Sequence, residues 1–134
     1  EIPVLANGDI VDGGTARAAL DASGAAGVMI GRGIQGRPRA AAGICRGLGG
    51  EAAVPAPEGD ALIQVVSGHY EAMLSFYGKD LGLRVARKQL GWYMDQAGTE
   101  TGLRGRVLRA LDPAEVLALL PDALRPAQGQ RAAA

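Results

Sequence analysis

The sequence predicts an α/β portion over residues 1–50 and an all-α helical bundle over residues 60–124. Two short apolar runs, Ile2–Ala6 and Gly27–Ile30, each stop at glycine and one charged residue, which is typical of buried parallel strands. The alanine-rich stretch between them predicts a helix, so the three segments form a right-handed strand–helix–strand unit. Beyond residue 60, the apolar residues recur at helical spacing instead.

Two helices are predicted in the α/β portion. The first covers Thr15–Ala22, with Thr15 capping the free N–H groups at its start and Ser23-Gly24 ending it. The second covers Arg39–Leu48, because Pro38 suits the first turn of a helix.

Two parallel strands cannot bury both faces of a sheet by themselves. The 134-residue chain also begins inside the first predicted strand and without an initiator methionine. We therefore expect the C-terminal part of a longer polypeptide, in which residues 1–50 are the last two strands of a (β/α)8 barrel of the TIM type. Such a barrel takes roughly 250 residues. The helical bundle would be a domain appended to it.

A linker between the two portions is expected at residues 51–59, where glycine and proline interrupt any helical period. Residues 125–134 are low in complexity and are expected to be a disordered tail. Four helices are predicted between them: Asp60–Tyr77, which Gly78 ends; Lys79–Gln96; Leu103–Leu111; and one that Asp112 caps and Pro113 begins, ending before Pro121 or soon after it. The inward face of the first of these helices is expected to hold Leu62, Val65, Val66, Met73 and either His69 or Tyr70.

The bulk composition excludes several classes of protein. The net charge is zero, which gives no global argument for binding to nucleic acid or membranes. No apolar run approaches the roughly 20 residues of a membrane span, and no signal peptide is visible. A single cysteine excludes an internal disulfide and fits a reducing cytoplasm, where we expect the protein to be located. His69 is the one histidine and has no second ligand, so no metal site is expected.

The two strand ends are the first candidate site. Asn7, Gly8 and Asp9 follow one strand, and Gly31 and Arg32 follow the next. Glycine lets backbone N–H groups approach a ligand, and the last two loops of α/β barrels frequently bind phosphate. Arg32 would add a positive charge, while Asp9 would cap a helix or orient Arg32 and bind through its backbone N–H. The alternative is that these glycines only make tight turns.

The second candidate site is a basic helix face. Arg84, Arg87, Lys88 and Gly91 fall at i, i+3, i+4 and i+7, whereas Leu83, Ala86, Leu90 and Tyr93 fall on another face and would pack inward. The basic face could bind RNA phosphates, with Gly91 letting the RNA backbone come close. From the charges alone, a solvated helix face explains the pattern better.

Several motifs together resemble the bacterial tRNA-dihydrouridine synthases. They are Ile2-Pro3-Val4-Leu5-Ala6-Asn7-Gly8-Asp9-Ile10, Gly27-Val28-Met29-Ile30-Gly31-Arg32-Gly33, Gln35-Gly36-Arg37-Pro38 and Arg84-Val85-Ala86-Arg87-Lys88-Gln89-Leu90-Gly91-Trp92-Tyr93. In order along the chain, they cover roughly residues 1–115. This resemblance makes RNA binding the preferred interpretation of the basic helix.

The resemblance implies an FMN enzyme that reduces the C5–C6 double bond of uridine in tRNA, with NADPH reloading the flavin. Asn7, Gly8, Asp9, Gly31 and Arg32 would hold the FMN phosphate, and Arg84, Arg87 and Lys88 would bind tRNA. The family's catalytic cysteine lies earlier in the barrel, so no catalytic residue is expected in this chain, which would be inactive alone. We expect a monomer.

Two other functions stay open: a different FMN- or phosphate-binding barrel acting on a small molecule, and a non-catalytic RNA-binding or assembly module.

The remaining reactive and aromatic residues are expected to have packing roles. Cys45 is predicted to be a small core residue, and His69 to be packed or solvent-facing. At least one of Trp92 and Tyr93 should lie in the core, with Trp92 half-buried beneath the stem of Lys88. Arg37 could reach RNA or cover the end of the barrel.

Overall fold

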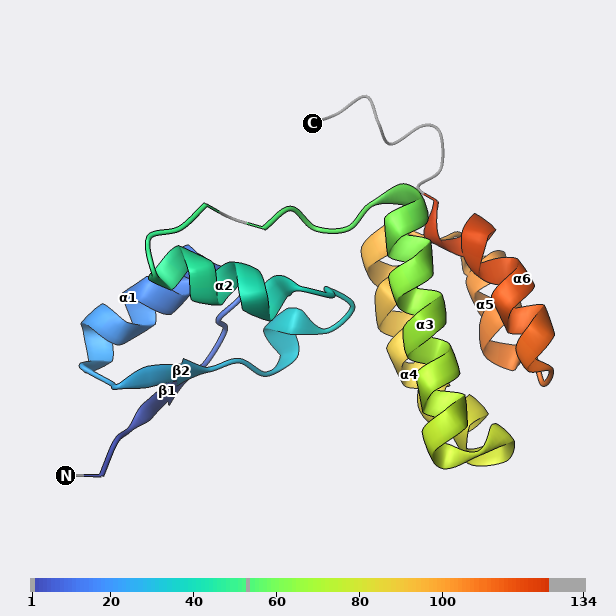
Figure 1. Cartoon of the computed structure of the whole chain (residues 1–134), viewed down its shortest axis with the longest axis horizontal. Helices are drawn as coiled ribbons and strands as arrows, with labels where there is room; N and C mark the ends of the chain where they lie inside the picture. The colour runs from blue at the N-terminus through green and yellow to red at the C-terminus, as the bar shows by residue number, and fades with distance from the viewer. Residues whose placement is uncertain (1, 53, 126–134) are drawn as a thin grey trace. The chain divides into compact units, whose positions relative to one another are not determined.

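The computed structural model describes residues 2–52 and 54–125, and the chain divides between Ala56 and Pro57 into two compact units (Figure 1). The division falls inside the segment expected to be a linker. The expected tail, residues 125–134, lies outside the described residues except for Arg125. In the described part of the chain, no helix is both long and apolar enough to cross a membrane.

The first unit contains a two-stranded parallel sheet and its helices. In chain order these are β1 (Leu5–Asn7), α1 (Gly13–Ser23), β2 (Gly27–Met29), the 3-10 helix η1 (Arg32–Ile34) and α2 (Ala40–Leu48). Leu5, Ala6 and Asn7 pair with Gly27, Val28 and Met29. Both strands are shorter than the apolar runs that predicted them: β1 contains only Leu5 and Ala6 of its run and adds Asn7, and β2 ends at Met29, one residue before Ile30.

Helix α1 begins at Gly13, two residues earlier than predicted, because Asp12 rather than Thr15 is its cap. The Asp12 carboxylate accepts a hydrogen bond from the N–H of Thr15 at 2.7 Å. The Thr15 hydroxyl in turn accepts one from the N–H of Asp12 at 3.0 Å. This reciprocal pair is a capping box, in which Thr15 is the third helical residue. At the other end, Gly24 adopts the left-handed conformation, as predicted, with φ of 62°.

The core of the first unit is small: its buried apolar residues are Ile10, Ala16 and Ile44. The prediction that Cys45 is a core residue is wrong, since its side chain is exposed. Ile44 and the partly buried Leu48 form the inward face of α2, and Cys45 is rotated about 100° from Ile44. Large apolar side chains also remain exposed on or beside the strands, among them Val4 (65%), Leu5 (59%) and Met29 (47%).

The second unit is the predicted four-helix bundle, consisting of α3 (Gly59–Tyr77), α4 (Lys79–Ala97), α5 (Thr101–Arg109) and α6 (Pro113–Leu124). Helix α3 ends at Gly78, and Asp112 caps α6 with Pro113 in its first turn, as predicted. Helix α6 continues three residues past Pro121. Helix α5 begins earlier than predicted because the Glu100 carboxylate accepts hydrogen bonds from the N–H groups of Gly102 and Leu103.

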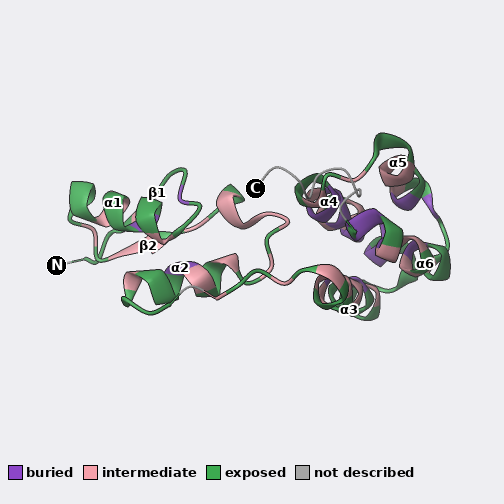
Figure 2. Ribbon diagram, turned by 90° about the horizontal axis from the view of Figure 1, so that it is seen from above, coloured by how far each residue is buried: buried purple, intermediate pink, exposed green. Residues whose placement is uncertain are grey.

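Each helix of the second unit buries one face (Figure 2). Helix α3 contributes Val66, Tyr70 and Met73, so the inward residue is Tyr70 and not His69. The predicted inward face of α4 is confirmed, since all four of its expected residues are buried: Leu83, Ala86, Leu90 and Tyr93.

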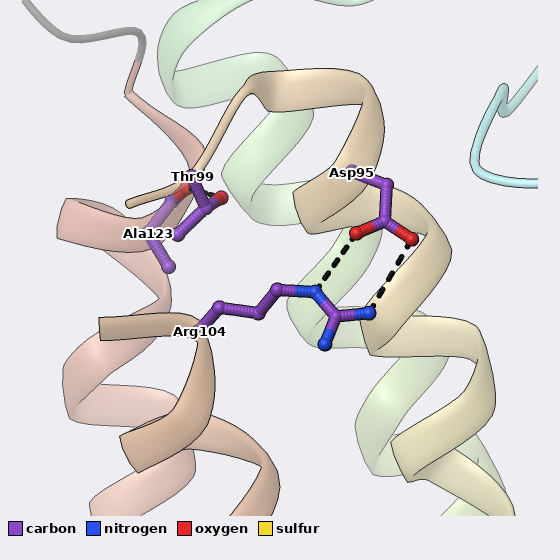
Figure 3. Close-up of polar contacts among 4 residues, drawn as sticks. All are labelled: Asp95, Thr99, Arg104 and Ala123. Atoms are coloured by element: carbon purple, nitrogen blue, oxygen red, sulfur yellow. Dashed lines mark hydrogen bonds and ion pairs between the residues drawn. The ribbon is translucent and has the colours of Figure 1, made fainter. Parts of the chain in front are cut away.

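Two polar contacts fasten the end of α4 to the last two helices (Figure 3). The guanidinium of Arg104 on α5 binds the carboxylate of Asp95 on α4. The hydroxyl of Thr99, in the turn after α4, donates to the carbonyl oxygen of Ala123 on α6. These two contacts therefore connect the end of α4 to α5, and the turn after α4 to α6.

The Glu100 cap predicts a pH dependence of stability. The N–H groups of Gly102 and Leu103 lower the pKa of Glu100 from its ordinary value of 4.5. A carboxyl group whose pKa is lower in the folded state stabilises the fold above its unfolded pKa, and loses this effect as the pH falls through the folded-state value. We expect Glu100→Gln to lower the unfolding midpoint at neutral pH, and the difference from wild type to shrink below pH 4.5. Thermal unfolding of both proteins from neutral pH downwards measures this, and a constant difference would contradict it.

Candidate functional site

The structure brings the two predicted strand-end loops to one edge of the sheet. Because Asn7 pairs with Met29 in a parallel register, Gly8-Asp9 and Gly31-Arg32 follow the same ends of neighbouring strands. Gly8 has φ of 142° and Asp9 has φ of 45°, so the chain turns sharply directly after β1. All five residues predicted to bind phosphate are exposed: Asn7, Gly8, Asp9, Gly31 and Arg32.

The turn leaves backbone N–H groups available to a ligand. None of the loop hydrogen bonds found in residues 2–52 uses the N–H of Gly8, Asp9, Gly31 or Arg32 as a donor. Several free N–H groups beside an arginine can bind an anion, because the N–H dipoles and the guanidinium attract the same negative charge. This donor set fits a phosphate group.

The two side-chain roles predicted for Asp9 are not found among the described residues. Helix α1 is capped by Asp12, and no ion pair joins Asp9 to Arg32. Only the backbone role expected for Asp9 is compatible with these contacts.

Gly33, which belongs to the predicted strand end Gly31-Arg32-Gly33 but was not predicted to bind phosphate, keeps the two loops close together. A Cβ atom at this position would overlap the carbonyl oxygen of Ile10 and lie 3.1 Å from Val11 Cγ1. Only glycine allows the loop after β2 to approach the loop after β1 so closely. In the sequence, Gly33 is recognisable only as a glycine directly after Arg32. This position does not reveal that Gly33 contacts the loop after β1.

Arg37 clamps the same two loops. Its guanidinium donates to the carbonyl oxygens of Val11 at 2.8 Å and Gly33 at 3.1 Å. The Arg37 Nη1 atom is thus engaged in joining the two loops.

The basic face of α4 is present, with one correction. Arg84 and Lys88 are exposed, and Arg87 is half-buried, with its Nε atom buried and without a hydrogen-bond partner among the described residues. The prediction that Gly91 offers an open approach is wrong: Gly91 is buried, and Arg104 Nη2 lies 3.2 Å from the position that a Cβ atom would take. A residue of the next helix covers it, which periodicity within α4 cannot reveal.

The aromatic residues of α4 have the predicted packing roles. Trp92 is half-buried, and Lys88 Nζ lies 5.0 Å from its ring centre, a cation–π contact. Tyr93 is buried, which raises the pKa of its hydroxyl group, and that hydroxyl lies 3.0 Å from His69 Nδ1. His69 therefore has a hydrogen-bonding role between α3 and α4.

Comparison with known proteins identifies the family. The family model described as "Dihydrouridine synthase (Dus)" matches residues 1–128, so the match covers the first unit and most of the second. This chain belongs to the dihydrouridine synthase family. The resemblance inferred from the strand-end and basic-helix motifs is thereby confirmed.

Several relatives match this chain over most of its length. A "Probable tRNA-dihydrouridine synthase" of Rhodobacter capsulatus is 56% identical over 122 residues, covering 91% of this chain and 37% of the relative. One of Rhizobium leguminosarum bv. phaseoli is 44% identical, covering 92% and 37%. The "tRNA-dihydrouridine synthase B" of Xanthomonas campestris is 40% identical, covering 91% and 37%. The chain thus spans a little over a third of the length of these relatives.

Proposed function

We propose that this chain is the C-terminal part of a complete tRNA-dihydrouridine synthase, which reduces the C5–C6 double bond of uridine in tRNA. The observation that carries this proposal is the family match, which runs through both the strand unit and the helical unit. Relatives that share up to 56% of their aligned residues with this chain are named as tRNA-dihydrouridine synthases. The reaction needs a reductant, which we propose is NADPH acting through FMN in the cytoplasm.

The first unit would be the end of a TIM barrel. Val4, Leu5 and Met29 expose large apolar side chains on or beside the two strands, whereas parallel sheets are normally covered on both faces. Further strands and helices of a complete barrel would cover them. The cysteine that protonates the uracil in this family would come from those other segments, and no catalytic role is proposed for Cys45.

The strand-end loops would bind the phosphate of FMN. Backbone N–H groups of Gly8, Asp9, Gly31 and Arg32 would donate to the phosphate oxygens, and Asn7 would border the site. The Arg32 guanidinium would balance the phosphate charge. Gly33 and Arg37 would keep the two loops together. When bound, FMN would supply the hydride, while these residues would only anchor its phosphate.

The helical unit would bind tRNA through the basic face of α4. Arg84 and Lys88 are exposed and Arg87 is partly so, and they share one side of a helix whose opposite side is packed in the core. Contacts from such a face to phosphates recognise RNA shape more than sequence. They would hold the tRNA so that an extruded uridine reaches the flavin.

The proposed reaction is tested directly in a complete synthase that contains this chain. The protein is incubated with FMN, NADPH and tRNA lacking dihydrouridine, and the digested RNA is analysed by mass spectrometry. We expect a uridine that has gained two hydrogens. Oxidation of NADPH by bound flavin without that nucleoside would instead indicate a small-molecule barrel enzyme. Binding of tRNA without binding of flavin would indicate a non-catalytic RNA-binding module.

A further inference from the structure

One position in the row of residues along the basic face of α4 is a glycine, and a side chain of α5 lies over it. Residues 84, 88, 91 and 95 follow one another at i, i+4, i+7 and i+11 and therefore lie in one row along α4. Arg84 and Lys88 carry positive charge, but the next position is Gly91. The Arg104 guanidinium lies there, with Nη2 3.2 Å from the position that a Cβ atom of Gly91 would take.

Asp95, the last member of this row, holds the guanidinium in place. Arg104 Nε donates to Asp95 Oδ1 at 2.8 Å, and Arg104 Nη2 donates to Oδ2 at 3.4 Å (Figure 3). Two parallel bonds fix the plane of the guanidinium as well as its position. The third nitrogen, Nη1, donates no hydrogen bond within the part of the chain that the structure describes. The Arg104 and Asp95 side chains are 36% and 53% exposed, so the pair is accessible from outside.

This arrangement changes the charge along the row. An unpaired Asp95 would repel phosphate at the end of the face, whereas the pair cancels that charge and presents an oriented N–H donor. Arginine suits this role because its planar fork can bind a carboxylate along one edge and a phosphate elsewhere.

We propose that Arg104 is a tRNA-contacting residue that α5 adds to the basic face of α4, and that Asp95 is a positioning residue for it. Gly91 leaves the space that the guanidinium occupies. The inference rests on the proposed binding of tRNA by this face, and it extends the face from one helix to two.

The test uses the sign of the effect of Asp95→Asn on tRNA binding. This substitution removes a negative charge, so simple electrostatics predicts tighter binding. If Asp95 positions Arg104, binding becomes weaker instead. We expect about a threefold rise in Kd near 0.25 M salt, because counterion release gives one phosphate contact roughly half a decade of affinity at that salt concentration relative to 1 M. The matched control is Asp122→Asn on α6, which changes the net charge equally at an exposed residue that forms no ion pair among the described residues. Its Kd should stay unchanged or fall slightly.

Arg104 itself is tested by the salt dependence of binding. In a complete synthase that contains this chain, Arg104→Gln should weaken binding of tRNA lacking dihydrouridine and reduce the slope of log K against log salt by about 0.9. Arg104→Lys should keep the wild-type slope but bind more weakly, because the charge remains and the fork is lost. Unfolding midpoints close to wild type show that each variant is folded.

Two results would overturn the inference: Asp95→Asn binding as tightly as the Asp122→Asn control, or Arg104→Gln keeping the wild-type slope. Both presuppose that the wild-type protein binds tRNA with a salt-dependent affinity. If the wild type itself does not, then the proposed tRNA-binding function of this face fails, which is a separate outcome.

Discussion

Replacing Gly33 with valine is expected to prevent stable binding of FMN by a complete synthase that contains this chain. A Cβ atom at this position overlaps the Ile10 carbonyl oxygen and lies 3.0 Å from the carbon of that carbonyl. These are backbone atoms, so they cannot turn aside as the end of a side chain could. The loop after β2 must then move away from the loop after β1, which separates the two halves of the proposed phosphate site.

The expected magnitude follows from the cost of overpacking. Inserting methyl groups into a filled site typically costs 1–3 kcal/mol, and two extra methyl groups on a β-branched side chain place valine at about the upper end. If this strain must be overcome to form the site, the affinity for FMN falls about 100-fold, since about 1.4 kcal/mol is tenfold in Kd. The flavin absorbance retained by the purified protein measures the loss.

A matched substitution in the same unit separates this local clash from a general sensitivity to glycine replacement. Gly43 lies inside α2, and a Cβ atom there would meet nothing within 4 Å. Gly43→Ala should therefore retain flavin and raise stability by up to about 1 kcal/mol, because alanine favours the helix. Flavin retained at the wild-type ratio by Gly33→Val would show that the contact with Ile10 does not shape the site.

Removing the basic residues of α4 is expected to have a similarly large effect on tRNA binding. Each phosphate contact contributes about 0.9 to the slope of log K against log salt for a duplex, and about 0.7 for a single strand. The triple change Arg84→Ala, Arg87→Ala and Lys88→Ala should reduce the slope by about 2 to 3. Raising the salt concentration from 50 to 200 mM weakens tRNA binding by the wild type. The same increase should weaken binding by the triple variant about 15- to 60-fold less.

The half-buried Arg87 makes a double variant informative. Because Arg87 Nε is buried, most of the loss is expected already from Arg84→Ala with Lys88→Ala. The control is Arg46→Ala with Arg125→Ala, which removes the same number of positive charges from positions outside α4: Arg46 lies on α2, and Arg125 directly follows α6. This control should leave the slope unchanged. Equal slopes for the control and the α4 double variant would remove α4 from the tRNA-binding surface.

Much of the helical unit could be predicted because its signals are local. The apolar residues of α3 and α4 recur at the helical period, so their inward faces follow from residues within one helix. Gly78 and the Asp112-Pro113 pair act on the turn that contains them, and both helix ends lie where they were expected. The cation–π contact of Lys88 with Trp92 joins residues four apart on one helix, and it was predictable for the same reason.

Contacts between distant segments could not be predicted in this way. Whether Cys45 is buried depends on which face of α2 packs against the rest of its unit. The side chain of cysteine does not specify that face, and Cys45 is exposed in the structure.

The sequence by itself determined the family, the two-part organisation, the four helices of the second unit and the strand ends where a phosphate site is proposed. These depend on motifs and periodicities that lie within single segments. The tertiary structure alone decided that Gly33 packs on Ile10, that Arg37 joins two loops and that Arg104 covers Gly91. In each case at least one partner is 13 or more residues away along the chain, and nothing in the spacing of either residue specifies the other.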